Sequence, residues 1–302
     1  MVTFYRRLPK FEYLAPKTLK ETLNLLAEHD PEKAMVYAGG TDVIPKLKSR
    51  LIEVPVVLVD LKDIPDLNYI VYDEKSGLRI GALATIRSVA EDSIVKERFS
   101  ILSQAANSIA STQVQNRGTI AGNICNALPS ADSAPALLCL KAKLLCIGQK
   151  GERTIKINEF FTGTGKTALN PNELLKEIQI PNMPENSKGV YIKLSRRSKM
   201  DLAVLGVAAV VSVENSLFSD VRIGLGCAAP TPIRANKAEE ILKKHAISDE
   251  LIMKAAQRAS EESKPRDSHR ASAQYRRWMI EVLVKRAINQ ALSKLGTFAG
   301  GT

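Results

Sequence analysis

The stretch Thr119-Ile-Ala-Gly-Asn-Ile-Cys-Asn-Ala-Leu-Pro-Ser-Ala-Asp132 decides the fold of this chain. Its small residues, Ala121 and Gly122, allow the backbone to come close to a large ligand, and Asp132 places a carboxylate at its end. An apolar run, residues 134–140, follows directly and would anchor the stretch to a hydrophobic core. The pattern predicts a binding loop attached to a buried element.

A second small-residue turn, Ala38-Gly39-Gly40-Thr41-Asp42, follows the apolar residues 35–37. Glycine permits a positive φ and removes the Cβ that would keep a phosphate away, while successive N–H groups point inward as donors. A single turn of this kind is common at strand ends for steric reasons alone. Two such turns, each with a neighbouring carboxylate (Asp42 and Asp132), predict that both clasp one extended anionic ligand.

The composition is that of an ordinary soluble protein, and its 302 residues predict two or three domains with a sizeable core. Aromatic residues make up 5%, which argues against a stacking platform for single-stranded nucleic acid. Residues 179–302 hold 20 Lys and Arg against 12 Asp and Glu, and so carry most of the net charge of +11. A basic nucleic-acid-binding module is therefore one alternative, but no helix-turn-helix, zinc-finger or RNP pattern supports it. A basic face that docks a partner subunit or attracts an anionic cofactor is the better interpretation.

The four cysteines are widely spaced, without a C-x-x-C pair, and the three histidines are scattered. This pattern predicts neither a zinc site nor an iron–sulfur ligand set, and it is typical of reduced, buried thiols in a cytoplasmic protein. The longest apolar run, Leu202 to Val213, is too short to span a bilayer, so no membrane insertion is expected. Arg6-Arg7 resembles the arginine pair of a twin-arginine export signal, but the apolar region that follows the pair in such a signal is missing here.

Residues 1–181 are expected to form one domain with two αβ lobes, at about 1–60 and 61–181. In the first lobe, Thr18 and Glu21 have capping-box spacing at a helix start, and Val54–Asp60 reads as a buried strand. In the second, Asp73–Gly77 predicts a hairpin loop.

The polar segment at 182–186 has linker composition and marks the expected start of a second α+β domain, residues 182–302. Three strands, at 189–194, 203–213 and 221–226, predict an antiparallel sheet. Helices are expected at about 237–244, 248–262 and 272–295. The last is expected to be amphipathic, with the apolar positions Trp278, Val282, Val284, Ala287 and Leu292.

Gly165-Lys166-Thr167 has the appearance of the end of a phosphate-binding P-loop. That motif requires glycine five positions before Gly165, where Phe160 stands, and a helix after it, where residues 168–171 turn away at a proline. We therefore interpret residues 160–167 as a surface turn.

Together with other segments, the two glycine turns closely resemble the FAD-binding (medium) subunit of the molybdenum hydroxylases, the xanthine dehydrogenase family. The likeness covers nearly the whole chain in the expected order. It includes the segments Phe160-Phe161-Thr162-Gly163, Glu173 to Pro181, Lys193-Leu194-Ser195-Arg196-Arg197, and Arg270 to Arg277. Each motif alone is weak, and their order gives the resemblance its weight.

The resemblance implies a two-lobed FAD-binding domain of the vanillyl-alcohol-oxidase (PCMH) type. A C-terminal α+β domain of the CO dehydrogenase flavoprotein type would follow it. Electrons from a molybdenum cofactor in a large subunit would cross two [2Fe-2S] clusters in a small subunit, reach FAD here, and leave to NAD or another acceptor. The protein would then be one part of a hetero-oligomer, such as a dimer of heterotrimers, with no metal and no catalytic side chain of its own. Some relatives carry a further cluster in a cysteine-rich insertion that this sequence lacks.

The resemblance also implies the residues that contact FAD. Amides in the first turn would hold the pyrophosphate, and the second turn would give a further phosphate and flavin contact. Asp132 would accept from ribityl or ribose hydroxyls, unless it is a simple helix N-cap. Leu175 would pack on the adenine or flavin ring, unless it is core, and Lys193 would reach the flavin, unless it is a solvated strand lysine. The implied set is Val36, Tyr37, Ala38, Gly39, Gly40, Thr41, Asp42, Val43, Gly118, Thr119, Ile120, Ala121, Gly122, Asn123, Asp132, Leu175 and Lys193.

A stand-alone flavoenzyme of the same fold, acting on its own substrate, remains the alternative within this chemistry. The organic substrate of a complex would bind another polypeptide.

Overall fold

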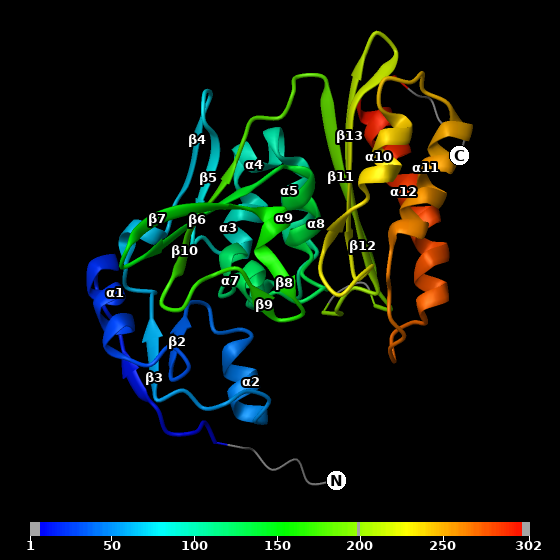
Figure 1. Ribbon diagram of the computed structural model, residues 1–302. Coiled ribbons are helices and arrows are strands. Elements are labelled where there is room, and N and C mark those ends of the chain that lie inside the picture. Colours follow the sequence, from blue (N-terminus) through cyan, green and yellow to red (C-terminus); the bar gives the residue numbers. More distant parts are fainter. Residues whose placement is uncertain (1–6, 198–199, 298–302) are drawn as a thin grey trace.

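The computed structural model describes residues 7–197 and 200–297 (Figure 1). The chain builds three layered units in sequence order: a small lobe on a three-stranded sheet, a larger lobe on a five-stranded sheet, and a C-terminal unit on a four-stranded sheet. One hydrophobic cluster joins the two lobes and includes Tyr191, Ala208 and Val210 of the C-terminal sheet, and a second cluster lies within the C-terminal unit.

The small lobe holds a parallel sheet of order β1-β3-β2, and β3 is buried along its whole length. Thr18 caps the first helix as predicted, because its hydroxyl accepts from the Glu21 N–H at 3.1 Å. The Gly39-Gly40 turn leaves β2 and leads into α2. The elements are β1 (Glu12–Leu14), α1 (Leu19–Glu28), β2 (Ala34–Tyr37), α2 (Val43–Ser49) and β3 (Val57–Asp60).

The larger lobe is built on an antiparallel sheet of order β4-β5-β10-β6-β7, with the predicted hairpin between β4 and β5. Its strands are β4 (Ile70–Asp73), β5 (Gly77–Gly81), β6 (Lys143–Gly148), β7 (Gly151–Lys156) and β10 (Leu174–Ile180). Its helices are η1 (Pro65–Leu67), α3 (Ile86–Glu91), α4 (Ser93–Arg98), α5 (Ser100–Asn107), α6 (Thr112–Gln115), α7 (Ile120–Cys125), α8 (Ser133–Cys139) and α9 (Ile157–Phe160).

The segment that looks like a P-loop is a small hairpin. Strands β8 (Phe161–Gly163) and β9 (Lys166–Thr167) pair with each other, and Gly165 takes a positive φ of 71° at the turn between them. No helix follows in this described segment, and β10 comes next. The surface-turn interpretation is supported for Thr164 and Gly165, whereas Phe160 is the fully buried last residue of α9 and does not belong to the turn.

The C-terminal sheet lies between two layers of helices (Figure 1). Helices α5 and α8 of the larger lobe pack on one side, and α10 and α12 pack on the other. Glycines allow the close approach, because a Cβ on Gly224 would lie 2.4 Å from the Pro135 carbonyl oxygen of α8. The elements are β11 (Ser187–Leu194), β12 (Leu205–Glu214), β13 (Leu217–Gly226), β14 (Ile233–Arg234), α10 (Asn236–Leu242), α11 (Asp249–Glu262) and α12 (Ala273–Lys294).

The three long strands of this sheet are those expected from the sequence, and the two-residue β14 adds a fourth at the edge. The buried face of α12 differs from the expected one. Val284, Ala287 and Leu292 are buried, whereas Trp278 and Val282 are 59% and 45% exposed. Including them in the apolar face was wrong, because the buried side of α12 at this level consists of Arg276, Ile280, Leu283 and Val284, and Trp278 and Val282 lie on the opposite side of the helix.

Arg276 is buried without a carboxylate partner in the described part of the chain, and backbone oxygens accept from it instead. It donates to the Val204 carbonyl and to the Ser268 hydroxyl, the latter at 2.8 Å.

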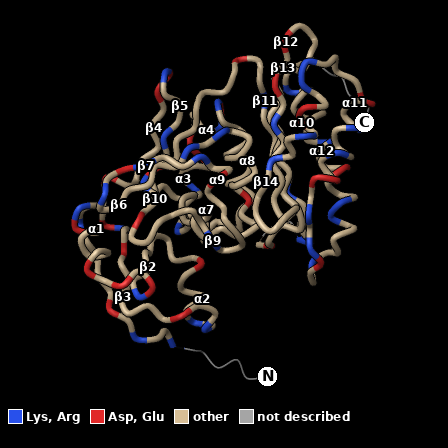
Figure 2. The backbone as a smooth tube through the Cα atoms, in the orientation of Figure 1, with Lys and Arg blue, Asp and Glu red and all other residues tan. Residues whose placement is uncertain are grey.

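Lys and Arg recur along α11 and α12 (Figure 2). None of the helices in the described ranges is both long and apolar enough to cross a membrane.

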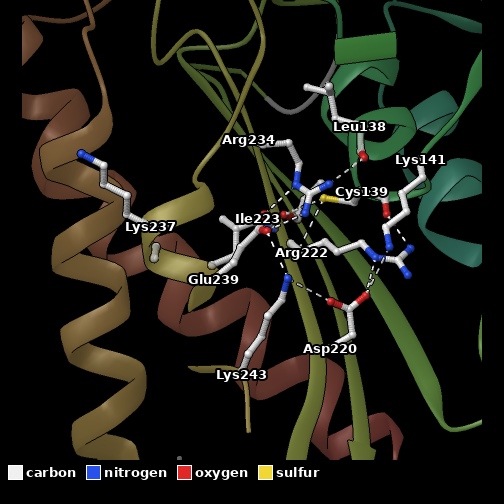
Figure 3. A network of polar contacts seen from close by, with 12 residues as sticks. Leu138, Cys139, Lys141, Asp220, Arg222, Ile223, Arg234, Lys237, Glu239 and Lys243 are labelled. Atoms are coloured by element: carbon white, nitrogen blue, oxygen red, sulfur yellow. Dashed lines mark hydrogen bonds and ion pairs between the residues drawn. The ribbon is translucent and has the colours of Figure 1, made fainter. Parts of the chain in front are cut away.

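A polar network fastens the C-terminal end of α8 to the sheet (Figure 3). Arg222 donates to the Cys139 carbonyl at 3.0 Å and to the Asp220 carboxylate at 2.7 Å. Lys243 also pairs with Asp220, at 3.2 Å, and Arg234 binds Glu239 at 2.6 Å through its Nε. The network holds α8 against β13 and thereby fixes the helix whose other end reaches the candidate site.

Candidate functional site

The two glycine turns, about eighty residues apart in sequence, meet in space. A Cβ on Gly39 would lie 1.9 Å from the Arg117 carbonyl oxygen and 2.8 Å from the Gly118 Cα, so backbone packs directly on backbone there. Real side chains do not approach so closely, and only glycine fits at position 39. A Cβ on Gly118 would in turn lie 3.1 Å from the Thr41 hydroxyl. The predicted meeting of the two turns is present.

The first turn presents unused hydrogen-bond donors. Gly40 has a φ of 72°, which changes the direction of the backbone between β2 and α2. In the described part of the structure, the backbone N–H groups of Gly39, Gly40 and Thr41 have no acceptor. Successive free N–H groups around a left-handed residue form a concave anion-binding site.

The second turn is more regular than the sequence suggested. Thr119 is the N-cap of the short helix α7, and its hydroxyl accepts from the Gly122 N–H at 2.9 Å. The stretch 119–125, which the sequence analysis treated as a loop, is therefore partly helical. At the other side of α7, the Asn123 side-chain oxygen accepts from the Ser133 hydroxyl at 2.6 Å, which ties α7 to α8.

A cavity of about 580 Å³ lies between the two turns, a size within the usual range for small-molecule sites. All three units contribute to its walls. Most residues that the sequence analysis assigned to the cofactor line it, namely Val36, Ala38, Gly39, Gly40, Thr41, Asp42, Val43, Gly118, Thr119, Ala121, Gly122, Asn123, Asp132 and Leu175. Among the described residues of the predicted set, Tyr37, Ile120 and Lys193 stand outside this lining.

Several lining residues were not anticipated as site residues. Lys46 of α2 reaches across to Asn126, and its ammonium group donates to the Asn126 side-chain oxygen. Met200 and Leu202, from the segment before β12, bring apolar surface from the C-terminal unit. Lys46 lies one helical turn after the glycine turn, and this spacing is the signal that would have found it. It gives the cavity a cation.

Asp132 joins the cavity to the C-terminal unit. Its carboxylate accepts from the Lys193 ammonium at 2.8 Å and from the Tyr191 hydroxyl at 2.7 Å. Lys193 also donates to the Ser108 carbonyl at 2.9 Å. The side chains of Asp132 and Lys193 are 6% and 10% exposed, so Lys193 is not a solvated strand lysine. Asp132 makes no capping hydrogen bond to α8, which removes the simple N-cap interpretation.

Burial controls the ionisation of this group. It raises the pKa of Asp132, and the attraction of Lys193 and the hydrogen bonds from Lys193 and Tyr191 offset only part of that rise. Burial also raises the pKa of the Tyr191 hydroxyl well above its usual value, and the neighbouring Asp132 adds to the effect. Tyr191 therefore remains a neutral donor to the carboxylate.

Leu175 and one of the four cysteines, Cys125, also belong to the cavity lining. Leu175 is buried on β10, beside a register shift in its pairing with β6, and it presents an apolar wall to the cavity. Cys125 also lines the cavity, and burial raises the pKa of its thiol to about 12, so it remains protonated. The four cysteines are free thiols. Across the described residues, no cluster of three or more His, Cys, Asp or Glu side chains is arranged to hold a metal ion.

These features fit the diphosphate of a dinucleotide cofactor. The Gly39–Thr41 turn presents three N–H donors that have no acceptor in the described structure, and Lys46 adds a cation to the lining of the same cavity. Apolar residues of the lining, including Leu175, Met200 and Leu202, suit a flat ring system.

Comparisons with known proteins agree with this geometry. Residues 9–183 match the family model of the FAD binding domain in molybdopterin dehydrogenase, and residues 190–291 match that of the CO dehydrogenase flavoprotein C-terminal domain. The chain is 35% identical over 285 residues to a xanthine dehydrogenase FAD-binding subunit of Escherichia coli O157:H7, covering 94% of this chain and 97% of that protein. It is 34% identical to the carbon monoxide dehydrogenase medium chain of Hydrogenophaga pseudoflava, covering 95% and 98% of the two chains.

Solved structures show the same similarity. A chain of the carbon monoxide dehydrogenase from Hydrogenophaga pseudoflava superposes with a TM-score of 0.92 at 34% identity, covering 95% of this chain and 99% of the other. A chain of quinoline 2-oxidoreductase from Pseudomonas putida 86 superposes with a TM-score of 0.89 at 28% identity, covering 97% and 100%. The chain therefore belongs to the FAD-binding, or medium, subunits of the molybdenum hydroxylase family of oxidoreductases, and its cofactor is FAD.

Proposed function

We propose that this chain relays electrons within a hetero-oligomer, from the [2Fe-2S] clusters of a small partner subunit through FAD to NAD or another acceptor. A large subunit with a molybdenum cofactor would oxidise the organic substrate. Bound FAD would supply the electron-transfer chemistry, because a flavin exchanges electrons with both one-electron and two-electron partners. The protein would then supply binding and orientation, with no catalytic side chain.

Within this proposal, the FAD diphosphate lies at the Gly39–Thr41 turn. Two observations carry the assignment: Gly39 packs on the Arg117–Gly118 backbone and so joins the two turns, and the three N–H groups of Gly39–Thr41, which have no acceptor in the described structure, belong to residues that line the cavity. Hydrogen bonds to a charged group contribute roughly 1.5–3 kcal/mol each, so a few of them support tight retention. Lys46 would add its positive charge to the same cavity.

The C-terminal unit completes the site in this proposal. Asp132 would accept from sugar or ribityl hydroxyls of the cofactor, and Lys193 would act on the cofactor through Asp132, which it contacts at 2.8 Å. Leu175 would contact a ring of FAD from β10. The division into residues 1–181 and 182–302 and a cytoplasmic location belong to the same proposal.

The decisive test of the site is Gly39→Ala, compared with the matched control Gly163→Ala. The added methyl group at position 39 meets the Arg117 carbonyl, whereas at position 163 the nearest atoms are 3.8 Å away. We expect Gly39→Ala to weaken FAD binding by roughly 100-fold, because it forces the two turns apart, and Gly163→Ala to retain it. Flavin absorbance per mole of purified protein measures the result, and full flavin content in Gly39→Ala would contradict the assignment.

The proposed partners have a separate test. The full chain is co-expressed with an iron–sulfur subunit and a molybdenum subunit of the same family from the same organism, and the purified complex is analysed by native mass spectrometry and iron content. A complex containing two [2Fe-2S] clusters per flavin supports the relay. A flavin-loaded chain that remains alone under these conditions would instead indicate a stand-alone flavoenzyme.

A further inference from the structure

Tyr37 lies outside the cavity lining, yet its ring contacts the turn that we assign to the diphosphate. A Cβ on Gly40 would lie 2.4 Å from Cε2 and 2.7 Å from the hydroxyl oxygen of Tyr37, so the ring fills the space where a side chain at position 40 would be. Gly40 also has the left-handed φ of 72°. The turn is therefore constrained on one side by the 117–118 backbone and on another by this ring.

The Tyr37 ring is itself held by side chains of the small lobe. The Lys62 ammonium lies 4.8 Å from the ring centroid, in a cation–π contact. Lys62 pairs with Asp60 at 3.0 Å, and Asp60 is only 3% exposed. Asp60 also accepts from the Tyr13 hydroxyl of β1, and it is the register partner of Tyr37 between β3 and β2. A chain of contacts therefore links the sheet to the turn, from Asp60 through Lys62 to the Tyr37 ring.

Preorganisation explains why such support matters. Two consecutive glycines give the turn more conformational freedom than other residues would, and ordering it on binding costs free energy. A turn already fixed in its binding conformation avoids that cost, and sites whose supporting residues are lost become too loose by about an ångström.

We propose that Tyr37 and Lys62 are positioning residues, which hold the three free N–H groups of the Gly39–Thr41 turn in the conformation that binds the diphosphate of FAD. The affinity for FAD then depends on two side chains that do not line the cavity. This inference rests on the proposed assignment of the turn to the diphosphate.

Tyr72 is a matched control for Tyr37, because its ring also has a cation over it. Tyr72 lies on β4, outside the cavity lining, with the Arg98 guanidinium 4.9 Å from its ring centroid and Phe99 packed against it. Replacing Tyr72 removes an equivalent contact from the larger lobe without touching the turn. If Tyr37 only stabilised the fold, Tyr37→Ala and Tyr72→Ala would have the same effect on the dissociation constant of FAD.

The experiment measures FAD affinity and stability separately. Flavin is removed from the full-length protein and its variants, FAD is titrated back while flavin fluorescence is followed, and urea unfolding of each flavin-free protein is recorded. We expect Tyr37→Ala to raise the dissociation constant roughly tenfold, the loss typical of a removed supporting residue. Lys62→Met should raise it about two- to fivefold. Tyr37→Phe, which keeps the ring, should remain within about twofold of the original protein, and Tyr72→Ala should leave the dissociation constant unchanged.

The inference is overturned if Tyr37→Ala and Lys62→Met bind FAD as tightly as the original protein, or if Tyr72→Ala weakens binding equally. If Tyr37→Ala does not fold, the comparison of Lys62→Met with Tyr37→Phe decides the question on its own. Failure of the site assignment is recognised separately, because Gly39→Ala would then keep its FAD. Loss of FAD in Gly39→Ala together with retention in both Tyr37→Ala and Lys62→Met rejects the positioning role alone.

Discussion

Helix α8 is joined to the C-terminal sheet at both ends, and the two junctions differ in their electrostatics. At the N-terminal end, beside the cavity, the Asp132 carboxylate is 6% exposed and contacts one cation, Lys193. At the C-terminal end, Asp220 is 25% exposed and pairs with the cations Arg222, Lys243 and, at 3.8 Å, Lys141 (Figure 3).

The difference appears in the ionisation of the two acids. Burial would raise the pKa of Asp220, but Arg222 and Lys243 outweigh it and the pKa is lowered. Burial raises the pKa of Asp132, and a single cation does not compensate for it. A salt bridge therefore does not by itself lower the pKa of a buried carboxyl group. The number of neighbouring cations and the access of water decide whether the pKa is raised or lowered. The less favourable junction is the one that faces the cavity, where functional groups are commonly found in perturbed environments.

Removing the acid at the cavity end should have the largest effect. Asp132→Asn leaves the Lys193 ammonium buried without a counter-charge, and the expected loss is about 3–5 kcal/mol in the free energy of unfolding. Urea unfolding of the flavin-free protein measures it. The double variant Asp132→Asn with Lys193→Met should recover most of the loss, because no unpaired charge remains. A loss below about 1 kcal/mol in the single variant would show that water reaches Lys193.

Breaking the other junction should cost less. Arg222→Ala removes the donor to the Cys139 carbonyl, while Asp220 keeps Lys243, and we expect a loss of about 1–3 kcal/mol. Arg87→Ala, which breaks an exposed pair with Glu91 on α3, is the control and should change stability by less than about 0.5 kcal/mol. Flavin content should be unchanged in Arg222→Ala, because the network lies at the end of α8 away from the cavity. A clear loss of flavin from Arg222→Ala would mean that the two ends of α8 do not act separately.

The smallest and most diagnostic effect is in the pH dependence of stability. Folded Asp132 has a pKa above its usual value of 3.8, so the folded state binds more protons and its contribution to stability falls as the pH rises from 3.8 to the raised pKa. Folded Asp220 has a pKa below 3.8, so its contribution is present above 3.8 and is lost as the pH falls through the lowered pKa. Subtracting the free energy of unfolding of the original protein from that of each Asn variant at the same pH removes the contribution of the other carboxyl groups.

These differences should have opposite signs on the pH axis. Relative to the original protein, Asp132→Asn should gain stability as the pH rises above 3.8, and Asp220→Asn should gain stability as the pH falls below it. Urea midpoints measured between about pH 3 and pH 6 give both curves. Curves of the same sign would show that the two junctions share one electrostatic character.

Much of the architecture was predictable because its signals are local. The Thr18 cap, the hairpin around 73–77 and the three long strands of the C-terminal sheet each follow from residues within a few positions of one another. The glycine turns were recognisable as well, since Gly39 and Gly40 are required by a backbone contact and a positive φ.

The remainder depends on contacts that no local pattern encodes. Lys193 and Asp132 are 61 residues apart, and nothing near Lys193 distinguishes a buried partner from a solvated lysine. The inward face of α12 was misassigned because Trp278 and Val282 also have helical spacing, while one of the buried positions is held by the charged Arg276. Oxygens of Val204, Cys227 and Ser268, from distant parts of the chain, accept its hydrogen bonds. The role of Lys46 depends on where α7 brings Asn126.

The exposure of Trp278 on α12 has a practical consequence. It is the one tryptophan in the sequence, and it lies in the outer helix layer, apart from the cavity-lining residues. Ultraviolet fluorescence of this side chain will therefore report on solvent at that surface. A blue shift in its emission on mixing with another polypeptide would locate the contact at α12, without a label and without disturbing the flavin.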